Sequence, residues 1–342
     1  MSRTAIVILN FNGEKLLPKF LPIVIKHSRE AEIIIADNCS SDQSISFVSK
    51  TFPGIRVIQL DKNYGYCGGY NRALRQVEAD YFVLLNSDVE VTVDWLKPMI
   101  DLLDRDVSIA AVQPKILSFI NRTQFEHAGA GGGFIDSLGY PFCRGRVFDH
   151  IEVDLGQYND TREIFWASGA CLMIRAETFK KFGFDEDFFA HMEEIDLCWK
   201  IHRTGQKILY CGSSTIYHEG AGTLPYRDPR KTYLNFRNGL SLLLKHLGSG
   251  ELLYKLALRI LFDWIAAFQF LIKGELRNSS AILRAHGRFV LNLRRDHRKR
   301  RKLRKSYPTY DNAMIYEGSI VIDYYLRGKK EGYAPAGFYE IP

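Results

Sequence analysis

The sequence lacks the long apolar run that a membrane-spanning helix requires. In its most apolar region, residues 252–273, Arg259 and Asp263 interrupt the pattern, and the uninterrupted apolar stretch is far shorter than about 20 residues. The N-terminus also lacks the basic region, apolar run and small-residue cleavage site of a secretory signal. These absences predict a cytoplasmic protein that is neither secreted nor membrane-spanning.

Paired or clustered cysteines are also missing. No CxxC pair and no spacing typical of a metal site connects any of the cysteines. We therefore expect structural thiols in a reducing compartment, not disulfides or a zinc centre. The cysteines are Cys39, Cys67, Cys143, Cys171, Cys198 and Cys211.

The charge is unevenly distributed along the chain. The 342 residues are 46% hydrophobic and 25% charged, and the formal net charge is +7. Nine Lys or Arg residues lie between Arg294 and Lys305, against the single acid Asp296. This segment predicts a local contact with an anionic surface. Nucleic acid is not expected as the partner, because no recognised nucleic-acid-binding fold accompanies the basic run.

Apolar runs alternate with segments of helical periodicity in the first third of the chain. This alternation predicts a doubly wound, mainly parallel α/β sheet. The predicted strands are residues 5–9, 32–36, 55–60, 81–85 and 109–112, and the predicted helices are residues 14–27, 44–51 and 69–77.

The strand at residues 81–85 is the centre of this pattern. Its five consecutive apolar residues indicate a strand buried on both faces, and Asn86, Ser87 and Asp88 follow directly. The carboxyl edge of a parallel sheet is where ligands bind, and a carboxylate there suits a divalent cation that holds phosphate. The alternative from this stretch alone is a simple Asx turn.

Polar residues also follow the first three strands. Asn10 and Asn12 follow the first, Asp37 follows the second, and a glycine-rich loop at residues 63–71 follows the third. That loop differs from a dinucleotide fingerprint, which follows the first strand, and from a Walker loop, which ends in GKS or GKT. We expect a nucleotide whose phosphates are held through a metal.

Acidic residues crowd a second region, residues 184–199. Glu193, Glu194 and Asp196 fall in the first turn of a helix predicted to begin near residue 192 and to end before Gly205. The alternative is a set of solvated acids at a helix end, although the surrounding aromatic residues are unusual for a solvated face. His218 follows a predicted strand and precedes a glycine turn, which favours a role as a metal or phosphate ligand.

Taken together, these motifs resemble glycosyltransferase family 2, the inverting nucleotide-sugar transferases, and within it the rhamnosyltransferase-like enzymes of bacterial surface polysaccharides. The resemblance extends over about residues 5–223. Its motifs are residues 7–13, 37–42, 63–71, 85–88, 169–172, 193–198 and His218.

The resemblance implies a Rossmann-like fold called GT-A over residues 1–235. It implies that Asp88, the last residue of a DxD-type motif, binds Mg²⁺ or Mn²⁺, with His218 as a further metal ligand. The motif begins here with Asn86 in place of Asp, which leaves one certain carboxylate. The implied nucleotide-binding residues are Leu9, Asn10, Asn12, Asp37, Asn63, Gly68, Asn71 and Asn86.

The resemblance also implies a general base at the acidic motif. The family has a Glu-Asp pair where this chain has Glu193 and Glu194, and Asp196 is a third acid of the predicted catalytic set. Alignment of the motif favours Glu194, and Glu193 stays open. A carboxylate would deprotonate the acceptor hydroxyl as it attacks the anomeric carbon, with inversion of configuration.

The C-terminal third is predicted to be a helical extension over residues 236–306, followed by a tail at 307–342. We expect residues 252–273 to form an amphipathic helix in the membrane interface, with residues 294–305 attracted to anionic lipid. The alternative is a buried core helix followed by a solvated basic tail. We expect strands or turns in the tail.

The sequence thus predicts an inverting, metal-dependent glycosyltransferase. Its partners would be a nucleoside-diphosphate sugar, with rhamnose as one candidate sugar, and a lipid-linked glycan in bacterial polysaccharide synthesis. We expect it at the inner face of the cytoplasmic membrane. The alternatives are a non-catalytic protein on the same fold and a nucleotidyltransferase.

Overall fold

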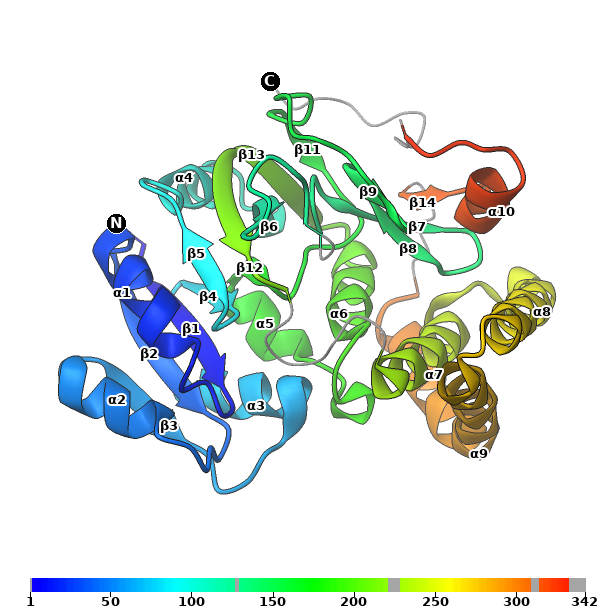
Figure 1. Ribbon diagram of the computed structural model, residues 1–342, viewed down its shortest axis with the longest axis horizontal. Coiled ribbons are helices and arrows are strands. Elements are labelled where there is room, and N and C mark those ends of the chain that lie inside the picture. The colour runs from blue at the N-terminus through cyan, green and yellow to red at the C-terminus, as the bar shows by residue number, and fades with distance from the viewer. Residues whose placement is uncertain (1, 127–128, 221–227, 309–313, 332–342) are drawn as a thin grey trace.

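The computed structural model describes residues 2–126, 129–220, 228–308 and 314–331. It shows a central mixed sheet with helices on both faces, a small second sheet, and a group of long helices at one end of the molecule (Figure 1). The part of the His218 motif beyond Gly220 and the last residues of the predicted tail lie outside the described residues.

The N-terminal half of the central sheet is parallel, as predicted. β1 pairs in parallel with β2 and with β4, and β2 pairs in parallel with β3. The intervening helices return the chain to the amino ends of the strands. These elements are β1 (Thr4–Asn10), α1 (Leu17–His27), β2 (Ala31–Asp37), α2 (Ser44–Thr51), β3 (Arg56–Gln59), α3 (Gly65–Leu74) and β4 (Tyr81–Leu85).

The other half of the sheet is mixed. β12 lies between β4 and β6 and is antiparallel to both, whereas β13 is parallel to β6. β5 and β11 each pair antiparallel with β13. The elements are β5 (Val89–Val91), α4 (Lys97–Arg105), β6 (Ile109–Ser118), β11 (Thr161–Glu163), β12 (Cys171–Arg175), α5 (Ala176–Phe182), η1 (Glu186–Phe188), α6 (Glu193–His202) and β13 (Lys207–His218).

Each face of the sheet has its own apolar core. Side chains of α1, α2 and α4 pack on one face, and side chains of α3, α5 and α6 pack on the other. All five residues of β4 are buried, which agrees with the prediction of a strand covered on both faces. The carboxyl ends of β1, β2 and β4 are therefore held at one edge of the sheet.

Two predicted elements have different bounds in the structure. The glycine-rich segment is mostly helix, because α3 begins at Gly65 and not at residue 69. A Cβ on Gly69 would come within 2.7 Å of Leu9 Cδ1, so the glycine lets α3 pack closely on β1. The apolar run at residues 164–174 is strand-like in the sequence, but β12 begins only at Cys171, after a turn in which Cys171 N donates to Ser168 O.

The weakly patterned middle of the chain forms a second, smaller sheet. Its strands are short. Part of the C-terminal tail completes this sheet, because Ile315 pairs with Ile135, and Asp136 accepts a hydrogen bond from Ile320 N. The elements are β7 (Gly133–Asp136), β8 (Pro141–Cys143), β9 (Arg146–Val147), β10 (His150–Ile151), β14 (Ile315–Tyr316) and α10 (Ile320–Tyr325).

Three long helices form the C-terminal helical region, beside α6 and away from α1 and α2 (Figure 1). They are α7 (Pro229–His246), α8 (Ser249–Ile272) and α9 (Leu276–Ser306). α7 therefore begins before residue 236. Leu240 and Leu244 of α7 pack against Phe289 of α9. In the part of the chain that the structure describes, no helix is both long and apolar enough to cross a membrane.

The polar side of α8 faces the protein. Arg259 is 3% exposed and Asp263 is fully buried. The Arg259 guanidinium donates to the carbonyls of Leu138 and Gly139, and Asp263 accepts from Tyr140 Oη at 2.9 Å. Leu252, Leu256 and Ile260 also pack on the protein, whereas most of the other large apolar residues of α8 are exposed. The alternative of an apolar face buried in the core does not describe this helix.

Candidate functional site

The carboxyl ends of β1 and β2 share a polar cluster. Asn10 Nδ2 donates to Asp37 Oδ1 at 3.1 Å, to Ser40 Oγ at 3.0 Å and to Ser44 Oγ at 2.9 Å. Asn12 Oδ1 accepts from Ser41 N at 2.9 Å. Asn10 and Asp37 are buried, whereas Asn12 is exposed. The structure thus brings three of the predicted nucleotide-binding residues together at the sheet edge.

The loop after β3 is joined to the same edge by Asn38. Its amide donates to Asn63 Oδ1 and to Gly65 O, both at 3.0 Å, and its oxygen accepts from Tyr64 N. Asn63 Oδ1 also accepts from Gly65 N. Asn38 therefore fixes the entry into α3, a role that was not predicted for it from the sequence.

The remaining predicted nucleotide-binding residues lie in different surroundings. Leu9 is half-buried on β1 beneath Gly69, and a Cβ on Gly68 would come within 2.8 Å of Tyr64 Cβ. Asn71 exchanges hydrogen bonds with the backbone of Phe184, at 2.9 Å in each direction. Asn71 thus connects α3 to the acidic segment, and its nucleotide-binding role stays a prediction.

Strand pairing brings Asp88 and His218 together although they lie far apart in the sequence. β5 begins directly after Asp88, and its Val89 pairs with His218 at the end of β13. His218 Nε2 lies 3.2 Å from Asp88 Oδ1 and 3.4 Å from Asn86 Nδ2. Both predicted metal ligands are therefore neighbours, with Asn86 beside them.

A third acid, Glu126, contacts the other ring nitrogen of His218. Glu126 Oε2 lies 3.2 Å from His218 Nδ1. Burial alone would lower the pKa of His218, but the two carboxylates, Asp88 foremost, raise this pKa to about 10. Glu126 comes from an irregular segment with no motif, so the sequence offered no signal for it. Its position suits it to orient the histidine ring.

Asp88 offers the carboxylate oxygen that a hard divalent cation prefers, and His218 offers a ring nitrogen when its imidazole is neutral. Two ligands of one octahedral Mg²⁺, each at about 2.1 Å, lie about 3 Å apart, which is close to the Asp88–His218 separation. Mg²⁺ commonly takes few protein ligands and completes its shell with water and substrate phosphate. Among the described residues, no group of three or more His, Cys, Asp or Glu side chains has a metal-binding arrangement. The assignment of Asp88 and His218 as the residues that would hold the ion stays a prediction.

Glu193 and Glu194 occupy the first turn of α6, as predicted. Glu193 is 5% exposed and Glu194 is half-buried, so neither is a freely solvated acid. Burial raises the pKa of Glu193 well above its usual range, and the neighbouring Glu194 raises it further. Burial raises the pKa of Glu194 to about 7. Both carboxyls are therefore held closer to their neutral form than a solvated glutamate would be.

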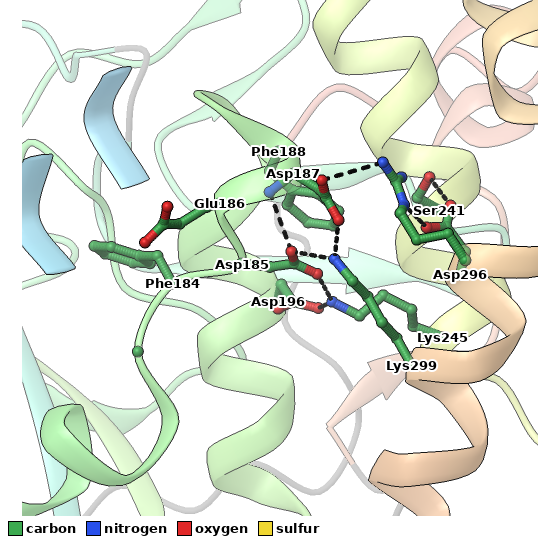
Figure 2. A network of polar contacts seen from close by, with 12 residues as sticks. Phe184, Asp185, Glu186, Asp187, Phe188, Asp196, Ser241, Lys245, Asp296 and Lys299 are labelled. Atoms are coloured by element: carbon green, nitrogen blue, oxygen red, sulfur yellow. Dashed lines mark hydrogen bonds and ion pairs between the residues drawn. The ribbon is translucent and has the colours of Figure 1, made fainter. Parts of the chain in front are cut away.

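Asp196 points in a different direction, toward α7. It is fully buried, and its carboxylate lies 2.5 Å from Lys245 Nζ and 2.8 Å from His246 Nε2. Lys200 contacts its second oxygen at 2.8 Å. Figure 2 shows Asp196 beside Lys245 in a network that joins the acidic segment to the C-terminal helices. These contacts suit a structural anion, and the predicted catalytic role of Asp196 is untested.

Tyr66 connects α3 to the turn before β12. Its hydroxyl donates to Gly169 O at 2.7 Å, and Asn86 N donates to the next carbonyl, Ala170 O, at 3.0 Å. Burial raises the pKa of Tyr66 well above its usual range. The turn at residues 169–170 thus contacts both α3 and the residue that follows β4.

The raised pKa of Glu194 predicts a pH-dependent cost to stability. The unfolded carboxyl releases its proton near pH 4.5 and the folded one near pH 7, so stability is highest below 4.5 and falls as pH rises to 7. Glu194→Gln stays neutral and avoids this loss. We expect it to raise the free energy of unfolding by about 1–3 kcal/mol at pH 8 but little at pH 4.5.

Denaturant unfolding of wild type and variant at both pH values measures this effect. Glu177→Gln, at an exposed glutamate in the first turn of α5, is the matched control and should change stability equally at the two pH values. The same gain from Glu194→Gln at pH 4.5 and pH 8 would contradict a buried carboxyl with a raised pKa.

Comparison with known proteins agrees with this architecture. The chain is 24% identical over 315 residues to the N-acetylglucosaminyl-diphospho-decaprenol L-rhamnosyltransferase of Mycobacterium tuberculosis, a match that covers 87% of this chain and 96% of that protein. It also resembles the solved structure of S. aureus TarS 1–349 in complex with UDP-GlcNAc, with a TM-score of 0.55, 17% identity, and 90% and 91% of the two chains covered.

A further solved structure is GalNAc-T7 with UDP, GalNAc and Mn²⁺, with a TM-score of 0.56 and 15% identity over 73% of this chain and 49% of that one. These likenesses show the GT-A fold. The family model described as glycosyl transferase family 2 matches residues 5–183. Because that match covers more than half of the chain, the protein belongs to glycosyl transferase family 2.

Proposed function

We propose that this protein is an inverting glycosyltransferase that moves a sugar from a nucleoside diphosphate to a hydroxyl of a growing, lipid-linked glycan. The observations that support this proposal are the contact between Asp88 and His218 after β4 and the burial of the Glu193–Glu194 pair in the first turn of α6. One pair suits the diphosphate and the other suits the acceptor hydroxyl.

The nucleotide lies at the edge formed by the ends of β1, β2 and β4. Asp37 is the proposed contact of the base, and the Asn10 cluster shapes the pocket around it. Asp88 and His218 would hold Mg²⁺ or Mn²⁺, which, when bound, neutralises charge that grows on the departing diphosphate. The Mn²⁺ in the structure of GalNAc-T7 supports this choice of ion.

Glu194 is the proposed general base. With a pKa of about 7, its carboxyl is partly ionised at neutral pH and accepts a proton readily. Glu193 is more deeply buried, and burial together with the charge of Glu194 holds the pKa of Glu193 well above its usual range. A glutamate at position 194 takes the acceptor proton as the oxygen attacks the anomeric carbon from the face opposite the diphosphate.

The proposed acceptor is a glycan on a polyprenyl diphosphate. The mycobacterial relative is named for transfer of L-rhamnose to N-acetylglucosaminyl-diphospho-decaprenol, and the alignment covers almost all of that protein. This likeness supports a lipid-linked acceptor and makes a rhamnosyl donor the first to test. It also favours sugar transfer over the nucleotidyltransferase alternative.

A panel of nucleotide sugars with Mn²⁺ or Mg²⁺ tests the proposal. Purified full-length protein is incubated with each donor, with and without a synthetic polyprenyl-diphosphate glycan, and released nucleoside diphosphate is measured. We expect release with one donor, stimulated by the acceptor. A protein that binds a donor but releases no diphosphate under any condition would support the non-catalytic alternative.

We also propose that the protein associates with the inner face of the cytoplasmic membrane through α8 and α9. The outward face of α8 carries large apolar side chains, among them Trp264 at 58% and Phe268 at 60% exposure. Leu276, Leu283 and Val290 continue this exposed face along α9. Exposed Arg and Lys residues of α9 lie next to these apolar side chains, a combination that suits an anionic lipid surface.

Vesicle binding tests this surface. Full-length protein should sediment with phosphatidylglycerol-containing vesicles at low salt, and high salt should release most of it, because surface charge attraction is screened. Phe268→Glu should reduce the bound fraction at least about tenfold, since it places a charge in the apolar face. Val107→Glu is the matched control, at an exposed valine between α4 and β6.

Two results would contradict a lipid surface. One is wild-type protein that stays in solution with anionic vesicles at low salt. The other is a change from dimer to monomer in Phe268→Glu with unchanged vesicle binding, which would assign the exposed face of α8 and α9 to a second copy of the chain.

A further inference from the structure

The segment before the glutamate pair has an unusual backbone. Phe189, His191 and Met192 have φ angles of 67°, 67° and 69°, in the left-handed region that non-glycine residues rarely adopt. Met192 is also the N-cap of α6, and it makes no side-chain capping bond in the described structure. Such strained conformations persist only where the surroundings impose them. Something outside α6 must therefore hold its first turn.

Asn238 of α7 makes the contacts that impose this conformation. Its side chain is fully buried, and its Nδ2 lies 3.1 Å from Phe188 O, 3.0 Å from Ala190 O and 2.7 Å from His191 O. One amide group has two hydrogens, so these three carbonyls converge on a single NH₂ group. The last of them lies two residues before Glu193.

Arg237 fixes the orientation of that amide. Arg237 Nε donates to Asn238 Oδ1 at 2.8 Å, so the oxygen faces the guanidinium and the NH₂ group faces the loop. Arg237 Nη2 also donates to Asp187 O at 3.0 Å and to Phe188 O at 2.9 Å. Adjacent residues of α7 thus hold successive carbonyls of the loop.

Ion pairs hold the outer part of the same loop. Lys245 of α7 contacts Asp185 at 2.6 Å, and Lys299 of α9 contacts both Asp185 and Asp187. Figure 2 shows Lys245 and Lys299 reaching toward these two aspartates from the helices of the C-terminal region. The ion pairs fix where the loop begins, whereas Asn238 fixes where it meets α6.

We propose that Asn238 is a positioning residue for sugar transfer, which holds residues 188–191 so that Glu194 points at the acceptor. This inference rests on the proposed function, because it takes Glu194 as the general base. It assigns the helical region a part in the active site in addition to any contact with lipid. Donor binding is separate, since the nucleotide edge is built from β1, β2 and β4.

Two substitutions of Asn238 test the role of its N–H groups. Asn238→Ala removes them, and Asn238→Asp keeps the shape and the oxygen that faces Arg237 but places a carboxylate against three carbonyls. We expect both to lower kcat by about 10–100-fold, because a misplaced base loses most of its effect. The KM for the donor should stay within about threefold of the wild-type value.

Control variants separate positioning from a general loss of stability. Asn235→Ala lies one turn earlier on α7 and should leave kcat unchanged. Leu244→Ala removes a buried side chain that packs on Phe289, so it destabilises the helical region without touching the loop. At temperatures where both variants are folded, Leu244→Ala should retain kcat and Asn238→Ala should not.

Hydrogen exchange of the peptide spanning residues 185–195 gives a readout without substrate. Exchange should be faster in Asn238→Ala than in Asn235→Ala or Leu244→Ala. The proposal is overturned if Asn238→Ala retains kcat within twofold, or if its loss matches that of an equally destabilised Leu244→Ala. If wild type releases no diphosphate from any donor, the proposed function fails, while unchanged exchange in Asn238→Ala refutes the positioning contact by itself.

Discussion

Glu194→Gln is expected to lower kcat by about 10²–10⁴, the usual contribution of a positioned general base. Glutamine keeps nearly the same size in the first turn of α6, yet it cannot accept a proton at neutral pH. Donor affinity should be nearly unchanged, because the nucleotide edge lies on β1, β2 and β4. Steady-state kinetics with the donor and acceptor found in the panel, together with calorimetric binding of the donor, measure both quantities.

Glu193→Gln is the matched control within the same helical turn. It should lower kcat less than Glu194→Gln does, because the family motif favours Glu194 as the base and Glu193 is the more deeply buried of the two. Retained activity in Glu194→Gln with loss in Glu193→Gln would reverse the assignment. Loss of donor affinity in both would mean that the acids bind sugar or metal, and that the base lies elsewhere.

Asp88→Ala is expected to abolish metal-dependent nucleotide binding, with affinity at least about 100-fold weaker, while the protein stays folded. Asp88 is the carboxylate placed against His218 by the pairing of β5 with β13, so its removal leaves the ion without its charged protein ligand. Calorimetric titration with the nucleoside diphosphate, with and without Mn²⁺, measures the loss.

Asp101→Ala provides the control for Asp88→Ala. Asp101 is a surface carboxylate of α4 paired with Lys97, so its loss should change neither binding nor its dependence on metal. Circular dichroism and thermal unfolding establish that both variants are folded. Unchanged metal-dependent affinity in Asp88→Ala would remove Asp88 from the site.

The start of α3 was predicted to be a glycine-rich loop, but it is helical in the structure. Glycines at positions 65, 68 and 69 suggest a loop, because glycine is unfavourable within helices. In the structure these glycines are helical, and Gly69 is needed because Leu9 lies where a Cβ would be. That requirement arises between two elements that lie far apart in the sequence, so it is absent from the local pattern.

The acidic motif at residues 193–196 also differs between what its local pattern indicates and what tertiary packing makes of it. The sequence placed Glu193, Glu194 and Asp196 in one helical turn, and the structure confirms their helix. It does not hold them in one environment, because Asp196 contacts Lys245 and His246 of α7 while burial raises the pKa of both glutamates. Glu126 reaches His218 from a segment without any motif. Only packing of distant segments distinguishes these positions.

The sequence by itself indicated the strands of the N-terminal half, the polar residues at their ends and the helix that carries Glu194, because strand burial and helix periodicity are local properties. Tertiary structure alone decided which face of α8 is outward, since a periodic pattern defines two faces without saying which one is covered. Arg259 and Asp263 turn inward because carbonyls of residues 138–139 and the hydroxyl of Tyr140 satisfy them there. Those partners lie more than a hundred residues away in the chain.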